Sequence, residues 1–150
     1  MKIIKILPIA ALLFLNCEQK EKPLEANHYR INGSVTGLEN GEIYLSKYPD
    51  MDTIKVENGR FTIENKLEEP VEQIALLKES NGNGSDKETY LSLFVEPEIM
   101  DLELIYSDFS KSKITGSKTQ DDYYRLAAVQ NQISDNYKKE LDAFEEISKK

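Results

Sequence analysis

The residues of this chain that could carry out chemistry are few and scattered. The sequence has one histidine, His28, and one cysteine, Cys17. Nucleophilic catalysis needs a base beside the nucleophile and a third group that orients the base. No such arrangement surrounds His28 in the sequence, so we expect this side chain to serve packing or the surface. We predict no catalytic residue and no cofactor, and we do not expect an enzyme.

Two groups of carboxylates could in principle hold a calcium ion. They are the pair Asp50 and Asp52 and the acidic run Glu96, Glu98, Asp101 and Glu103. Neither group has the spacing of an EF-hand loop with its glycine, so we predict no metal site. The glycine-rich stretch 81–84 lacks the lysine and the following helix of a phosphate-binding loop.

The eight tyrosines leave one binding hypothesis open. A sheet face that carries several tyrosines can bind a sugar or a peptide, because each ring is apolar with one polar end. The chain would then be a small-ligand or glycan-binding β-module. Tyrosine is also favoured in strands for packing alone, and we expect packing to account for most of the eight.

The amino-terminal segment is typical of an export signal. Lys2 and Lys5 precede the apolar run 6–15, which is shorter than the ~20 residues that span a membrane. Segment 1–16 ends directly before Cys17 and resembles a bacterial lipoprotein signal peptide. In such signals the chain is cut before the cysteine, and the thiol carries a diacylglycerol. An ordinary signal peptide followed by an incidental cysteine is the alternative.

Residues 17–27 are polar and rich in glutamate and lysine, which predicts a flexible tether. We therefore expect Cys17 to be lipidated and to anchor the chain to a membrane in the envelope of a Gram-negative bacterium. The mature domain would be periplasmic or exposed on the surface.

The charge of the chain restricts its partners. It carries 19 basic and 27 acidic residues, a net charge of −8. Without Lys2 and Lys5 the mature chain would have 17 basic residues and a net charge of −10. Such a charge opposes binding to nucleic acid, and we predict no nucleic-acid partner.

The stretch 52–64 predicts a β-hairpin. Its centre is Asn58-Gly59, which favours a type I′ turn with positive φ at both central residues. With these two residues as the loop, the predicted pairs are Glu57 with Arg60, Val56 with Phe61, Lys55 with Thr62, and Ile54 with Ile63. Both apolar pairs then lie on one face of the two-stranded ladder.

Further short strands are predicted on both sides of this hairpin. They cover residues 28–35, 42–48, 71–78, 89–95, 99–106 and 113–115. The run 74–77 is apolar throughout and suits burial on both faces. Many short strands with frequent turn signals indicate an antiparallel β-sandwich or partly open barrel over residues 28–116.

The period of the sequence changes to that of a helix over residues 117–150. Ser117 and Gln120 have the spacing of a capping box, in which each side chain accepts a hydrogen bond from a free amide. Apolar residues then recur at three- and four-residue steps: Tyr123, Leu126, Ala127, Ile133, Tyr137, Leu141, Phe144 and Ile147. One long amphipathic helix is predicted after the β-domain.

The second half of this helix is the predicted partner surface. It carries Tyr137, Leu141, Phe144 and Ile147 on a segment expected to pass the edge of the sheet. An uncovered stripe of this size usually marks an interface, so we expect a protein partner or self-association there. The alternative is that the stripe folds back onto the sandwich.

Several short motifs of the mature chain together resemble a known module. They are residues 29–35, 41–45, 52–61, 94–97 and 114–117, followed by Tyr123-Tyr124. From Tyr29 onward the chain resembles the uncharacterised β-rich domain that precedes the thioredoxin fold in Gram-negative, Bacteroidota-type thiol–disulfide oxidoreductase lipoproteins. The resemblance implies a stand-alone, non-catalytic accessory domain. The redox cysteines of those proteins have no counterpart among the residues of this sequence.

Overall fold

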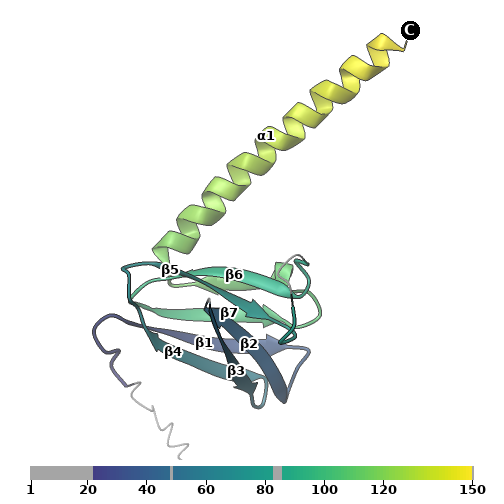
Figure 1. Cartoon of the computed structure of the whole chain (residues 1–150). Helices are drawn as coiled ribbons and strands as arrows, with labels where there is room; N and C mark the ends of the chain where they lie inside the picture. Colours follow the sequence, from purple (N-terminus) through teal and green to yellow (C-terminus); the bar gives the residue numbers. More distant parts are fainter. Residues whose placement is uncertain (1–21, 48, 83–85, 150) are drawn as a thin grey trace, which may run out of the picture.

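In the part of the chain that the structure describes, eight strands form two sheets of four strands each (Figure 1). The computed structural model describes residues 22–47, 49–82 and 86–149. The first sheet has the order β4-β1-β7-β8 and the second has the order β3-β2-β5-β6. The strands are β1 (His28–Thr36), β2 (Gly41–Lys47), β3 (Asp50–Val56), β4 (Arg60–Lys66), β5 (Glu72–Leu77), β6 (Tyr90–Val95), β7 (Ile99–Ile105) and β8 (Lys113–Thr115). A short 3-10 turn, η1 (Phe109–Lys111), precedes β8, and the helix α1 (Lys118–Ser148) follows it.

The core lies between the two sheets. Its fully buried side chains include Tyr29, Ile31, Ile43, Leu45, Ile74, Leu76, Leu93, Met100, Leu102, Leu104 and Phe109. Buried residues alternate with exposed or half-buried ones along β2, β4 and β7, as expected for strands with one buried face. The run 74–77 in β5 is buried at every position, as predicted. The sheets do not close on each other, so the fold is the sandwich rather than the barrel.

One strand pair in the sandwich is parallel. β1 pairs with β7 in parallel, with Ile31 level with Met100, whereas every other named pair is antiparallel. All of the second sheet and β4 lie between β1 and β7 in the sequence. No tight turn therefore fixes the relative direction of these two strands, which meet through tertiary packing.

The predicted hairpin is correct at its turn and wrong in its strands. Asn58 and Gly59 have φ of 52° and 68°, and Glu57 pairs with Arg60. Beyond that pair the strands separate, because β3 joins β2 in one sheet and β4 joins β1 in the other. Val56 and Phe61 are both buried in the core, but they belong to opposite layers.

The physical reason for this separation is that each strand finds an apolar partner in its own sheet. Ile54 is level with Ile43, and Ile63 is level with Ile31. An isolated two-stranded ladder would cover only one face, whereas separated strands enclose the core from both sides. The turn becomes a corner, held by a hydrogen bond of 2.7 Å from the Gly59 amide to the Glu39 carbonyl.

The first sheet depends on a glycine at the centre of β1. Gly33 lies opposite Phe61 of β4. A Cβ atom at Gly33 would lie 2.1 Å from Cε1 and Cζ of the Phe61 ring. The ring therefore occupies the space that any other residue at position 33 would need.

The segment before β1 contacts the sandwich. The Arg30 guanidinium donates a hydrogen bond of 2.9 Å to the Lys22 carbonyl and forms an ion pair of 2.8 Å with Glu64. The Leu67 amide donates to the Asn27 carbonyl at 2.7 Å. Residues 22–27 of the predicted tether are thus joined to β1 and to the end of β4.

Candidate functional site

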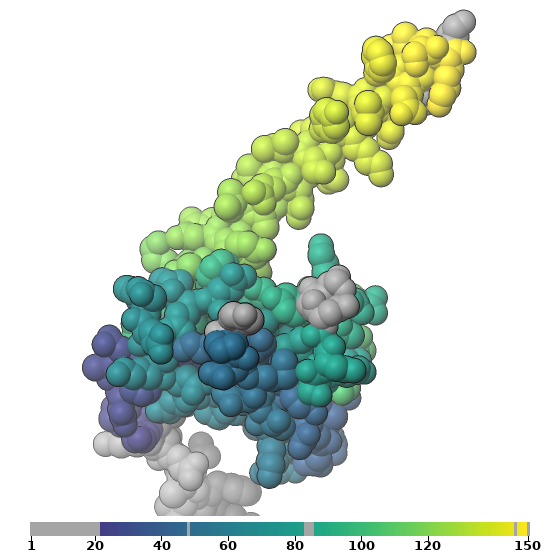
Figure 2. Space-filling view, in the orientation of Figure 1, coloured from purple at the N-terminus to yellow at the C-terminus, as the bar shows by residue number. Residues whose placement is uncertain are grey.

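The helix α1 extends away from the sandwich as a single rod (Figures 1 and 2). It has 31 residues, which corresponds to about 46 Å at ~1.5 Å per residue. It contacts β6 and β8 of the sandwich. Only its first turns are therefore positioned by the β-domain.

Ser117 begins the helix as predicted, whereas Gln120 has a different partner from the predicted one. The Ser117 hydroxyl accepts a hydrogen bond of 3.1 Å from the Gln120 amide. The Gln120 side chain does not complete a capping box but accepts a hydrogen bond of 2.8 Å from the Phe94 amide in β6. Both side chains are 1 % exposed. This pair of bonds joins the start of the helix to an edge strand of the second sheet.

Glu96 caps the amino-terminal turn of the helix. Its carboxylate accepts hydrogen bonds from the amides of Lys118 and Thr119 and one of 2.9 Å from the Thr119 hydroxyl. Burial raises the pKa of Glu96, but these hydrogen bonds outweigh it and the pKa lies below its ordinary value. A carboxylate here also meets the positive end of the helix dipole.

The other carboxylates of the acidic run lie along the chain after Glu96, with Glu98 just before β7 and Asp101 and Glu103 in it. Across the described ranges, no three side chains of His, Cys, Asp or Glu gather closely enough to hold a metal ion. His28 lies at the start of β1, where its Nδ1 atom is 3.0 Å from the Ala26 carbonyl oxygen.

An aromatic pair also joins the first turns of the helix to the sandwich. The rings of Tyr123 and Phe94 lie 5.4 Å apart between centroids. Beyond Tyr123 the four predicted partner residues Tyr137, Leu141, Phe144 and Ile147 are between 44 and 72 % exposed. The stripe therefore does not fold back onto the sandwich.

The exposed apolar stripe extends beyond the four predicted partner residues and covers most of the length of the helix. Its large apolar members are Tyr123, Leu126, Val129, Ile133, Tyr137, Leu141, Phe144 and Ile147, all exposed. At 100° per residue these eight side chains cover an arc of about 120° on one side of the helix. Val129 was missing from the predicted stripe, although its four-residue spacing to Ile133 places both side chains on the same face.

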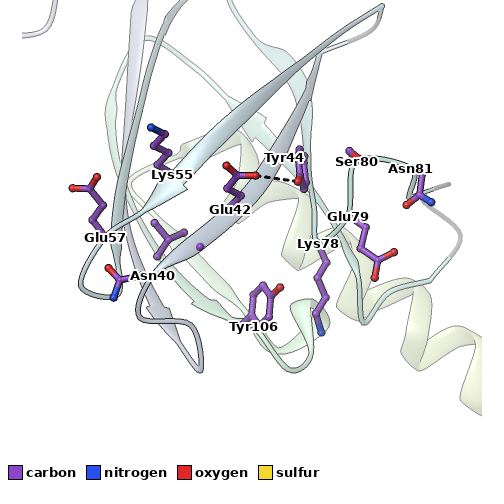
Figure 3. A pocket seen from close by; sticks show the side chains of 12 residues that line it. Asn40, Glu42, Tyr44, Lys55, Glu57, Lys78, Glu79, Ser80, Asn81 and Tyr106 are labelled. Atoms are coloured by element: carbon purple, nitrogen blue, oxygen red, sulfur yellow. Dashed lines mark hydrogen bonds between the residues drawn. The ribbon is translucent and has the colours of Figure 1, made fainter.

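A hollow in the surface of the sandwich is a second candidate site (Figure 3). It has a volume of about 970 Å³ and lies at one end of the second sheet. Tyr44 donates a hydrogen bond of 3.3 Å to Glu42, and Lys78 lies 4.6 Å from the centroid of the Tyr106 ring. Two pairs of lining side chains thus contact each other, and both pairs include a tyrosine. Tyr29 is in the core, and Tyr123, Tyr124 and Tyr137 lie on the helix.

The family of the chain is shown by a match to a family model. Residues 29–123 match the model described as Domain of unknown function (DUF4369). The chain belongs to the DUF4369 family. No curated protein and no solved structure matches the chain.

The DUF4369 match separates the base of the helix from its exposed part. It begins in β1, includes all later strands and ends at Tyr123, the residue that contacts Phe94. Leu126 and the stripe residues after it lie outside the match. The connection through Ser117, Gln120 and Glu96 is thus within the DUF4369 match.

The predicted lipidation residue Cys17 and the signal segment 1–16 lie outside the described residues. Within the described residues, α1 is too polar to be a membrane-spanning helix, and no other helix of sufficient length is present there.

Proposed function

We propose that this DUF4369 protein is a non-catalytic, lipid-anchored module of the cell envelope whose helix α1 binds a protein partner. The observation that supports the docking role most strongly is the exposure of the eight-residue stripe on a helix fixed at one end. Exposed apolar surface of this extent is uncommon in a soluble domain without a binding role.

The attachment of the first turn of the helix to the domain supports the same proposal. Ser117, Gln120 and Glu96 hold its first turn through hydrogen bonds to the domain. A helix with a fixed base presents its stripe in one direction, so less freedom is lost when a partner binds. The helix-in-groove and helix-pair modes of recognition both use such a stripe.

The proposed membrane anchor rests on the sequence. The apolar run 6–15 ends directly before the residues Asn16-Cys17, and Cys17 is the sole cysteine. The resemblance of the mature chain to the domain before the thioredoxin fold in envelope lipoproteins supports the same location and an accessory role. A dithiol couple needs two thiols, and the sequence supplies one.

Photo-cross-linking in intact cells tests the docking role. A photo-reactive amino acid in place of Leu141 should trap a protein, whereas the same amino acid in place of Ala128 should not. Ala128 is exposed on the opposite side of the helix and provides the matched control. Adding Phe144→Asp to the Leu141 probe should remove the product. Equal trapping from both positions would contradict the proposal.

Metabolic labelling tests the anchor. Cells fed a labelled fatty acid should label the wild-type chain and retain it in the membrane fraction, whereas Cys17→Ser should lose both. Equal label and equal retention in the two proteins would contradict lipidation at this residue.

A second candidate function is the binding of a small ligand or glycan in the hollow beside Tyr44 and Tyr106. Its volume of about 970 Å³ is in the range of small-molecule sites. Tyr44→Ala with Tyr106→Ala should then remove binding in a glycan-array experiment, while Tyr90→Ala, outside the hollow, should preserve it.

A further inference from the structure

The exposed stripe is symmetric about its own midpoint. Asp135 is the centre, and the stripe members at equal distances on its two sides match in character. The equidistant apolar pairs are Ile133 with Tyr137, Val129 with Leu141, Leu126 with Phe144, and Tyr123 with Ile147. The polar positions within the arc match each other as well, because Gln130 and Glu140 are also equidistant from Asp135.

Such symmetry is what an antiparallel pair of identical helices requires. A two-fold axis perpendicular to the helices reverses the direction of the second helix, so a residue lies level with the residue equidistant from the axis on the other copy. With the axis at Asp135, each large apolar side chain of one stripe is level with a large apolar side chain of the other. We propose that the partner of α1 is a second copy of this chain, bound antiparallel with its two-fold axis at Asp135. This inference rests on the proposed docking function of the helix.

The polar residues favour the antiparallel direction over the parallel one. In a parallel pair each residue meets its own copy, so the two Glu140 carboxylates would face each other inside an apolar seam. Two ionised carboxylates that face each other repel, which destabilises the parallel pair. In the antiparallel pair Glu140 is level with Gln130, whose amide can donate a hydrogen bond to a carboxylate. Asp135 lies on the side of the helix opposite the stripe, so the axis brings no carboxylates together.

The size of the stripe suits a stable pair. Three of its eight members, Tyr123, Tyr137 and Phe144, are aromatic, and aromatic side chains can bury roughly 150–250 Å² each. A pair contributes six aromatic and ten aliphatic side chains, which is consistent with the about 1,200 Å² or more of a specific interface. The antiparallel direction also places the two sandwiches at opposite ends of the helix pair.

Disulfide cross-linking in membranes tests the direction and the register. Two differently tagged full-length chains are expressed together, one with Gln130→Cys and the other with Glu140→Cys. These substitutions leave all eight apolar members of the stripe in place. Oxidation should form a mixed 130–140 dimer, because the two positions are level in the proposed pair. The parent chain, which keeps Cys17 in both copies, measures the background.

Homotypic and outer-face controls sharpen the test. Two Gln130→Cys copies should give no dimer above background, since the same residues would lie about 15 Å apart along the helices, beyond disulfide reach. The combination of Asn131→Cys with Lys139→Cys is also level in the pair, but both residues face outward and should not cross-link.

Three results would overturn the antiparallel pair. Dimers between identical positions without the mixed product would show a parallel pair. Cross-linking that is equal at the outer-face positions would show non-specific collision. No product above background, together with a Leu141 photo-cross-link to another envelope protein, would overturn self-pairing while the docking function stands. The loss of both kinds of product would contradict the docking function too.

Discussion

Phe109 and Phe144 show how the sandwich and the helix differ. The side chain of Phe109 is fully buried in the core, whereas the Phe144 side chain is 67 % exposed on α1. The two residues have the same chemistry, and only their surroundings differ. The sandwich uses its apolar residues for its own stability, and the helix leaves its apolar residues available for another molecule.

This comparison predicts a large difference between two identical substitutions. Phe109→Ala should reduce the free energy of unfolding of the sandwich by about 3–5 kcal/mol, because it opens a cavity in the core. Phe144→Ala should change it by less than about 0.5 kcal/mol, as for other exposed positions. Chemical denaturation of both variants measures the difference. Similar losses of stability in the two would show that the helix belongs to the core.

A smaller effect is expected inside the first sheet. Gly33→Ala should destabilise the sandwich by about 1–3 kcal/mol, because the new Cβ atom meets the Phe61 ring. Reducing the ring with Phe61→Leu should recover part of the stability lost in the Gly33→Ala background. Denaturation of the two single variants and the double variant gives the coupling energy. Additive losses would contradict the proposed contact.

The connection between the two regions should depend on pH. Hydrogen bonds lower the pKa of Glu96. The stability that its carboxylate gives to the start of the helix is therefore fully present above the ordinary glutamate pKa of 4.5. It should be lost as pH falls below 4.5 through the lowered pKa of the folded protein. Protection of the Lys118 and Thr119 amides from hydrogen exchange should then decrease. Glu96→Gln should weaken the protection of these amides at neutral pH and reduce its pH dependence. The control Glu98→Gln, at an exposed position, should keep both the protection and its pH dependence.

Local patterns in the sequence predicted the elements of the sandwich but not all of their pairings. The Asn58-Gly59 turn was correct because turn conformation depends on the turn residues themselves. Burial of Val56 and Phe61 is compatible with a two-stranded ladder and with a two-layer core. The alternation of apolar and polar residues along 52–64 therefore could not distinguish these arrangements. The choice depends on Ile43 and Ile31, which supply the partners of the separated strands.

The helix shows the same limit of sequence reasoning. Ser117 was predicted as its cap because the relevant contact is local, but Gln120 bonds to Phe94, 26 residues earlier. The apolar spacing predicted the stripe, and the same spacing is found in helices that cover their own core. Exposure of the stripe required the three-dimensional structure. Its symmetry about Asp135 can be read from the sequence once that exposure is known.

The most direct test of the difference between the two regions is a pair of matched double variants. Leu141→Asp with Phe144→Asp places two charges in the stripe. Ala128→Asp with Asn131→Asp places two charges on exposed positions of the opposite side of the same helix. We expect both variants to keep the unfolding free energy of the sandwich. We expect only the stripe variant to lose the mixed dimer between Gln130→Cys and Glu140→Cys copies. Unfolding of the sandwich by the stripe variant would contradict the assignment of α1 as a docking surface.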